Sequence, residues 1–179
     1  MASILNVDSI RNSSGVGGIT IDSLGRVTSG SGVEIDIWRL PSDHTTNSTI
    51  TAWSRPDYTG YAKAGTGMTH SSGIFTFPNT GLWKVVFSFR TNLVSSDTSA
   101  GAIIDLSTDT GSNFTEIAGA FENRNSNSSL HTQALINCTN TSTFQVRFRS
   151  TALDSGGKIS GHASRLDTNV LFERVADHQ

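Results

Sequence analysis

Side chains able to act as acids, bases or nucleophiles are scattered along this sequence. A hydrolase needs a nucleophile, a base and a group that orients the base. No Gly-x-Ser-x-Gly nucleophile motif occurs, so we interpret the histidines as surface or loop residues. They are His44, His70, His131, His162 and His178. A glycosidase needs two carboxylates that face one cleft. Asp and Glu are present, but no motif pairs two of them, and we expect no enzymatic activity.

The stretch Asp105–Ser112 resembles a calcium-binding loop, but its spacing differs from that of an EF-hand. An EF-hand requires glycine at the sixth loop position and a helix on each side. Here Gly111 is the seventh residue, and the flanking segments have the pattern of strands. We therefore predict a polar hairpin turn and no bound cofactor or metal, with a weak calcium site as the alternative.

The composition favours an all-β protein that binds neither nucleic acid nor membrane. Hydrophobic residues make up 35% of the chain and charged residues 16%, and much of the remainder is Ser, Thr, Asn and Gly. These residues have low helix propensity and suit short strands joined by polar turns. The net charge is −2 without a basic stretch, which argues against a nucleic-acid partner. We find no signal peptide and no apolar run of about 18 residues that could span a membrane.

Alternation of apolar and polar residues with a period of two dominates the chain after residue 32. In the clearest segment, Gly73–Arg90, two strands flank a Pro-Asn-Thr-Gly turn. Further strands are predicted at intervals of about a dozen residues, which is the spacing of a sandwich. They are the segments 33–38, 50–53, 102–107, 114–121, 130–137, 143–150 and 169–175. We expect roughly eight to ten strands in one jelly-roll β-sandwich over residues 33–179.

Residues 1–32 form a separate unit with too few apolar side chains for a core of its own. The sequence predicts a short strand at 19–22, a turn into a second short strand at Val27, and then a flexible linker. An isolated hairpin is marginally stable, so we expect this arm to pack on another chain, with a loose tail as the alternative. Its candidate attachment residues are Ile4, Val7, Ile10, Ile19, Ile21 and Val27.

The segment Gly73–Arg90 resembles a signature of the globular head of complement component one-q and its relatives, a superfamily that shares the tumour necrosis factor (TNF) jelly roll. The matching residues are Ser72, Gly73, Phe75, Phe77, Pro78, Gly81, Trp83, Phe87 and Phe89. The resemblance covers about residues 33–175, and it implies a TNF-like jelly roll that forms a homotrimer. The closing strand departs from the family pattern, since Thr168-Asn169-Val170 stands where Ser-Gly-Phe is often seen.

The N-terminal arm resembles the leader of structural proteins of marine tailed bacteriophages, in which it precedes a jelly-roll domain of this kind. The residues that carry this likeness are Leu5–Asn12 and Ile19–Val27. The resemblance implies a virion protein that is displayed as a homotrimer on a tail fibre or on the capsid surface. It also implies that the arm binds other virion proteins.

Apolar residues on both faces of single strands also favour a trimer. Trp38 lies on the face opposite Ile35 and Ile37, and Val86 lies opposite Trp83. A sandwich buries one face of each sheet, so a second apolar face needs a partner. The candidate residues for the trimer interface or the core are Trp38, Phe75, Phe77, Trp83, Val86, Phe87, Phe89, Phe144, Phe148 and Phe172.

Together, these observations favour a tail fibre or fibre-tip protein whose loops contact the host surface, for example a glycan on it. The candidate contact loops are Asp43–Ser48, Asp57–Thr66, Asn92–Ala100, Asn123–Ser129 and Ala152–His162. The alternative is a capsid decoration protein that strengthens the head, and the shortness of the chain favours it. A cellular ligand-binding module is a third hypothesis, against which the missing signal peptide and the lone Cys138 argue.

Overall fold

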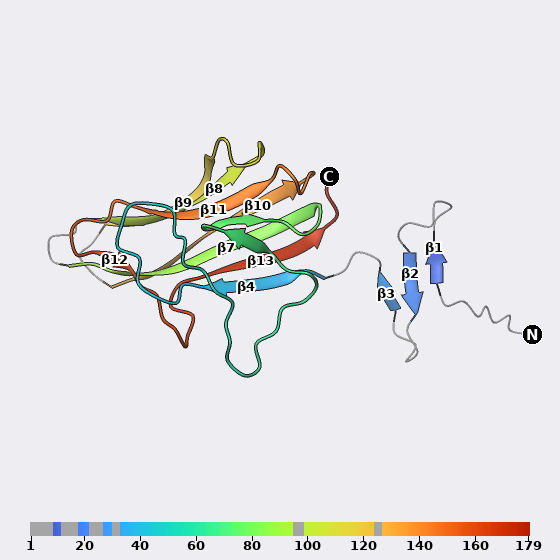
Figure 1. Cartoon of the computed structure of the whole chain (residues 1–179), viewed down its shortest axis with the longest axis horizontal. Coiled ribbons are helices and arrows are strands. Elements are labelled where there is room, and N and C mark those ends of the chain that lie inside the picture. The colour runs from blue at the N-terminus through green and yellow to red at the C-terminus, as the bar shows by residue number, and fades with distance from the viewer. Residues whose placement is uncertain (1–8, 12–17, 22–26, 30–32, 95–98, 124–126) are drawn as a thin grey trace, which may run out of the picture. The chain divides into compact units, whose positions relative to one another are not determined.

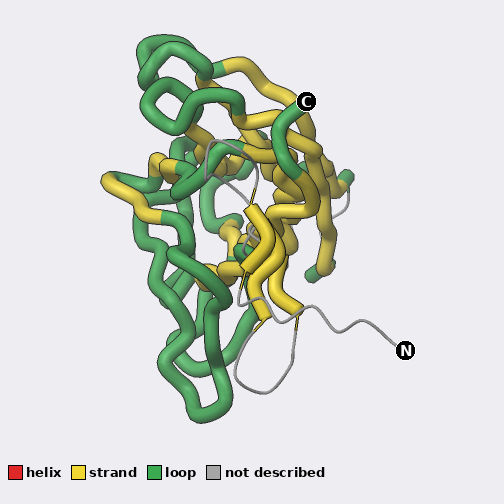
Figure 2. Tube along the Cα trace, turned by 90° about the vertical axis from the view of Figure 1, so that its right-hand side faces the viewer, coloured by secondary structure: helices red, strands yellow, loops and turns green. Residues whose placement is uncertain are grey.

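The computed structural model describes residues 9–11, 18–21, 27–29, 33–94, 99–123 and 127–179 (Figure 1). The chain divides into two compact units, Met1–Val33 and Glu34–Gln179. Every regular element in these ranges is a β-strand (Figure 2), which confirms the predicted all-β class. None of the residues described forms a helix long and apolar enough to cross a membrane.

The first unit contains a small antiparallel sheet of three strands. In spatial order they are β1 (Ser9–Arg11), β2 (Gly18–Ile21) and β3 (Val27–Ser29). The sequence predicts β2 and the start of β3 at Val27, but it assigns Thr28 and Ser29 to a linker, although both belong to β3, and it does not predict β1. Ile4 and Val7, which the sequence suggests for attachment, lie outside the described residues.

The strand register brings the other candidate attachment positions together. Ile10 is paired with Ile19, and Ile21 is paired with Val27. Directly paired positions share one face of an antiparallel sheet, and so do positions two apart along a strand. All four positions therefore lie on the same face of the small sheet.

The second unit is a sandwich of two antiparallel sheets. The first sheet has the order β10-β7-β13-β4 with β12 paired to β7, and the second has the order β5-β6-β11-β8-β9. Figure 1 shows β8 and β9 on the side of the sandwich away from β4. The first sheet consists of β4 (Ile35–Arg39), β7 (Gly81–Asn92), β10 (Ser129–Cys138), β12 (Lys158–Ile159) and β13 (Asn169–Ala176). The second consists of β5 (Thr69–Ser71), β6 (Ile74–Thr76), β8 (Ala100–Ser107), β9 (Thr115–Glu122) and β11 (Gln145–Thr151).

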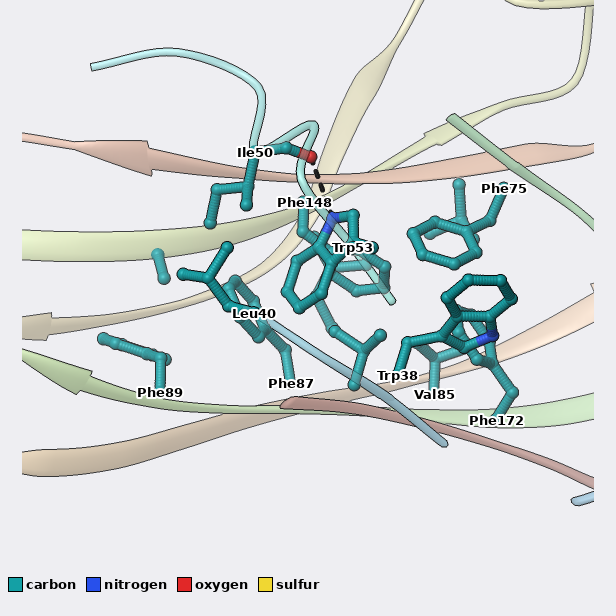
Figure 3. Packing of buried hydrophobic residues seen from close by; sticks show 14 of the residues in the cluster. Trp38, Leu40, Ile50, Trp53, Phe75, Val85, Phe87, Phe89, Phe148 and Phe172 are labelled. Carbon is teal, nitrogen blue, oxygen red and sulfur yellow. Dashed lines mark hydrogen bonds between the residues drawn. The ribbon is translucent and has the colours of Figure 1, made fainter. Parts of the chain in front are cut away.

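Aromatic rings from both sheets meet edge to face in the middle of the sandwich (Figure 3). The ring centroid of Trp53 lies 5.7 Å from that of Phe148 in the second sheet and 6.0 Å from that of Phe87 in the first. Such pairs contribute about 0.5–1.5 kcal/mol each beyond the area that they bury. The candidate interface or core residues that lie in this core are Trp38, Phe75, Phe77, Trp83, Phe87, Phe89, Phe148 and Phe172.

The segment 50–53 is not a strand, so the sequence prediction is wrong here. Ile50 and Trp53 are both buried, and the chain bends between them, where the backbone N–H of Trp53 donates a hydrogen bond of 3.1 Å to the carbonyl oxygen of Thr51. The indole Nε1 of Trp53 donates a hydrogen bond of 2.8 Å to the carbonyl oxygen of Ile50, and this contact closes the bend. Strands β5 and β12 are missing from the prediction, because two or three residues are too few to show alternation.

Strand β4 buries the face that carries Trp38. The Trp38 ring lies 5.5 Å from the ring of Phe75 in the second sheet, and its Nε1 donates a hydrogen bond of 2.9 Å to Asp36. Ile35 is 36% exposed and Ile37 is half-buried on the opposite face. The side chains of β4 alternate between two faces, as the sequence predicts. The face with Trp38 is buried, and the aliphatic face lies on the outside.

Two buried carboxylates hold a long loop against the start of this strand. Glu34 and Asp36 are 5% and 1% exposed. Asp36 accepts hydrogen bonds of 2.8 Å from Nη2 of Arg55 and 2.9 Å from the backbone N–H of Met68. Glu34 accepts one of 2.9 Å from the backbone N–H of Gly67. Because a buried charge is tolerated only when it is paired and hydrogen-bonded, these contacts fix the loop in place.

We predict that Glu34→Gln loosens the loop between Arg55 and Met68. The new amide presents an N–H group to the N–H groups of Thr66 and Gly67, which now donate to the carboxylate. A loop held by fewer contacts opens more often, so trypsin should cut after Lys63 several-fold faster in the native protein. The control Glu122→Gln should leave the rate unchanged, and equal rates in both variants would contradict this role of Glu34.

The turn between β5 and β6 requires glycine at position 73. Gly73 has φ +79°, and a Cβ atom there would collide with the carbonyl oxygen of Ile50. We therefore predict that Gly73→Ala lowers the free energy of unfolding by about 3 kcal/mol. Gly60 has φ +92° and open space around it, so Gly60→Ala should cost only the left-handed strain of about 1–2 kcal/mol. Urea unfolding curves compare the two, and equal losses would contradict the collision.

Candidate assembly surface

Aliphatic side chains form a row on the outer face of the first sheet. The register places Ile37, Leu171 and Val86 side by side across β4, β13 and β7, and Gln133 continues the row on β10. Directly paired residues share a face, so this row lies opposite the aromatic core. We call the outward residues of this row and of the next row toward the start of β4 the assembly surface: Ile35, Ile37, Lys84, Val86, Gln133, Leu135, Leu171 and Glu173.

A second row on this surface is more exposed. It runs through Ile35, Glu173, Lys84 and Leu135. Leu135 is 66% exposed, and a hollow of about 330 Å³ lies beside it and Lys84. Burying a leucine fully is worth roughly 1.5–3 kcal/mol, so Leu135 is a site where a partner would contribute to stability.

The structure places only part of the predicted interface set on this surface. Val86 lies on it, Phe144 packs half-buried against the core, and the other candidates are core residues. Leu135 and Leu171 were not among the candidates. A signal for both exists in the sequence, because each stands next to an inward apolar residue, Ile136 or Phe172. A strand that is apolar at successive positions is one that both faces bury.

The Asp105–Ser112 segment covers the last three residues of β8 and the first part of the polar hairpin turn to β9 that the sequence predicts. Asp105 accepts hydrogen bonds of 2.9 Å from Nε of both Arg147 and Arg149. Hydrogen bonds from the side chain and backbone of Asn113 and from a serine hydroxyl hold the pKa of Asp109 at about 2. Among the described residues, no group of three or more His, Cys, Asp or Glu side chains is placed to hold a metal ion.

Two histidines are partly buried and make contacts within the sandwich. The backbone of His44 pairs with that of Ile159, and burial lowers the pKa of its half-buried ring. The ring of His70 lies 4.8 Å from that of Trp38, edge to face, and its Nε2 lies 3.2 Å from the carbonyl oxygen of Trp53. The interpretation as a surface or loop residue is therefore wrong for His70, which lies in β5, whereas His44 lies in the loop after β4, as predicted.

The lone cysteine belongs to the core. Cys138 is fully buried at the end of β10, and burial raises the pKa of its thiol to about 11. Since the thiolate is the reactive form of cysteine, this side chain acts as a small apolar residue at neutral pH.

Comparison with known proteins identifies the fold. No protein-family model matches the chain, and no curated protein matches its sequence. The structure of Eiger TNF from S. frugiperda matches with a TM-score of 0.60 and 11% identity, over 83% of this chain and 96% of that one. The structure of murine APRIL at pH 5.0 matches with a TM-score of 0.58 and 10% identity, over 80% and 99%. The predicted TNF-like jelly roll is confirmed, and at these identities the likeness concerns the fold alone.

Proposed function

We propose that this protein is a structural component of a bacteriophage particle and is displayed there as a homotrimer that forms through the assembly surface. The observation that carries the proposal is the exposed row with Ile35 and Leu135, on a sheet whose other face already forms the core. The TNF-like jelly roll supports it, because the sequence resemblance to that superfamily implies a homotrimer. The likeness of the arm to phage leaders supports the location on a virion.

The charges of the assembly surface suit a second copy of the same chain. Glu173 and Lys84 are direct neighbours in the middle of the exposed row, and Ile35 and Leu135 flank them. One acid and one base within an apolar patch allow identical surfaces to meet with opposite charges in contact. In a cyclic assembly each residue contributes once per protomer, so a few aliphatic side chains stabilise the trimer several times over.

In this proposal the arm joins the trimer to the particle. The positions of Ile10, Ile19, Ile21 and Val27 share one face of its small sheet. A sheet of this size cannot bury that face by itself. Other virion proteins would cover it, which is the role that the resemblance to phage leaders implies.

We predict that Leu135→Asp converts the trimer to a monomer at micromolar concentration. The carboxylate would lose its hydration at the interface, at a cost larger than the contribution of the leucine. Because Leu135 is 66% exposed in the protomer, the free energy of unfolding of that protomer should change little. Light scattering after size exclusion gives the mass of each variant.

The matched control is Ile117→Asp, which places the same charge at an exposed aliphatic position of the second sheet. This variant should remain a trimer. A monomeric wild-type protein would overturn the homotrimer, and a trimeric Leu135→Asp variant would show that the assembly surface is not the interface.

Deletion of residues 1–32 tests the role of the arm. We expect a soluble trimer that no longer joins phage particles, because the jelly roll and the assembly surface lie after residue 33. Sedimentation with purified particles measures incorporation. If the truncated protein still sediments with them, the arm does not attach it.

The number of copies per particle separates the two forms of the proposal. A tail fibre or fibre-tip protein that contacts the host should be present in a few to a few dozen copies, in multiples of three. A capsid decoration protein that strengthens the head should be present in hundreds. Quantitative mass spectrometry of purified particles distinguishes them.

A further inference from the structure

An aromatic ring lies open on the outer face of the second sheet. Phe121, near the end of β9, is 51% exposed. Its ring spans two glycines: Cε1 lies 2.7 Å from the place of a Cβ on Gly101, and Cε2 lies 3.3 Å from that of a Cβ on Gly119. The ring therefore rests on the backbone of β8 and β9, and its other side faces solvent.

The backbone conformation does not require glycine at position 101 or at position 119. Both lie inside strands, and neither has a positive φ. Glycine inside a strand weakens it, and it often marks a close approach of another group. At position 101 any side chain would occupy the place of the Phe121 ring. Because Gly101 and Gly119 have no side chain, the ring lies close to the backbone of the sheet.

Polar groups lie on the same face of the sheet, in the row of the ring and in rows further along the strands. The register places Thr151 in the same row as Phe121 and Gly101, and Arg149 in the next row. Nη2 of Arg149 lies 2.8 Å from Oε2 of Glu116, and both side chains are partly open to solvent. Because each charge has an opposite charge beside it, the flank offers strong hydrogen-bond donors and acceptors without a large net charge.

We infer that Phe121 is the stacking platform of a carbohydrate-binding site for a neutral glycan. The face of an aromatic ring is electron-rich and attracts the polarised C–H groups on the flat side of a sugar ring. A hydroxyl of the stacked sugar would then reach Thr151, and the next units of an oligosaccharide would reach Arg149 and Glu116 further along the sheet. Such a site has one apolar body and a few polar groups that fix orientation. The idea that the glycan belongs to a host surface rests on the proposed function.

A sugar fits this place better than a protein does. A stable protein–protein contact buries about 800 Å² on each partner, whereas the open apolar area here is one side of one phenyl ring. Ile117, the other exposed hydrophobic residue of β9, stands where the pairing of β8 and β9 shifts register. The platform also lies on the sheet that the proposed assembly surface leaves free, and Thr151 directly precedes the predicted contact loop 152–162.

The test uses the full-length protein and neutral oligosaccharides of glucose, galactose and N-acetylglucosamine. Saturation-transfer NMR detects weak binding, and titration gives its strength. We expect at least one of these sugars to bind the wild type with millimolar or better affinity. Phe121→Ala should weaken that binding at least tenfold, whereas Phe121→Tyr should keep it. Ile117→Ala is the matched control for loss of an exposed apolar side chain and should bind as the wild type does.

A second variant tests the geometry of the ring rather than its presence. Gly101→Ala keeps Phe121 but places a methyl group where the ring now lies, and it should weaken the same binding. Equal binding by the wild type and Phe121→Ala would overturn the inference, and so would the absence of binding by the wild type to every sugar at about 10 mM. Light scattering on each variant keeps this result separate from the trimer, because a trimer without sugar binding contradicts only the platform.

Discussion

Contact between the aromatic rings of the two sheets is the interaction on which the rest of the structure depends. Phe75 of the second sheet lies 5.1 Å from Phe172 of the first, and Phe148 lies 5.0 Å from Phe87, measured between ring centroids. Rings of this size bury a large apolar area, so they determine which side of every neighbouring strand points inward. Once the inner faces are fixed in this way, the residues on the two outer faces are free to differ.

The two outer faces differ in how many of their side chains have partners within the chain. On the second sheet, the carboxylate of Asp105 lies between the guanidinium groups of Arg147 and Arg149, and Arg149 also pairs with Glu116. Charges arranged like this have their partners within one chain. On the first sheet, two neighbouring rows of outward side chains are mainly aliphatic, and Leu135 remains exposed. The second sheet thus pairs these charges within the chain, although Phe121 stays open on it, whereas the first sheet leaves aliphatic side chains uncovered.

The sequence predicts the core well because alternate aromatic residues in a strand have one way to be buried together. Trp83 and Phe148 lie where the period of two places them. The pattern fails where burial follows from a bend, as at Trp53, whose depth depends on a hydrogen bond within the loop. It also fails for the outer faces. Leu135 joins a row only through the register between β10 and β7, which are far apart in the chain.

The platform at Phe121 shows the same limit. A phenylalanine in a predicted strand suggests a core residue, and only the pairing of β8 with β9 brings Gly101 beneath its ring. A glycine in the sequence gives no such indication by itself, because many glycines lie in turns. In both places, the residue that lies opposite on the neighbouring strand follows from the strand pairing and not from the local sequence.

The buried carboxylates at the start of β4 also bear on how the domain carries mechanical load. Any pull applied through the N-terminal arm enters the sandwich at Glu34, directly before an edge strand that pairs with β13 along its length. The ladder hydrogen bonds run perpendicular to the strands, so a pull along β4 shears several of them at once instead of opening them one by one. Glu34 and Asp36 spread part of that force into the loop that ends at Met68. These contacts would raise the force needed to pull β4 away from the sandwich.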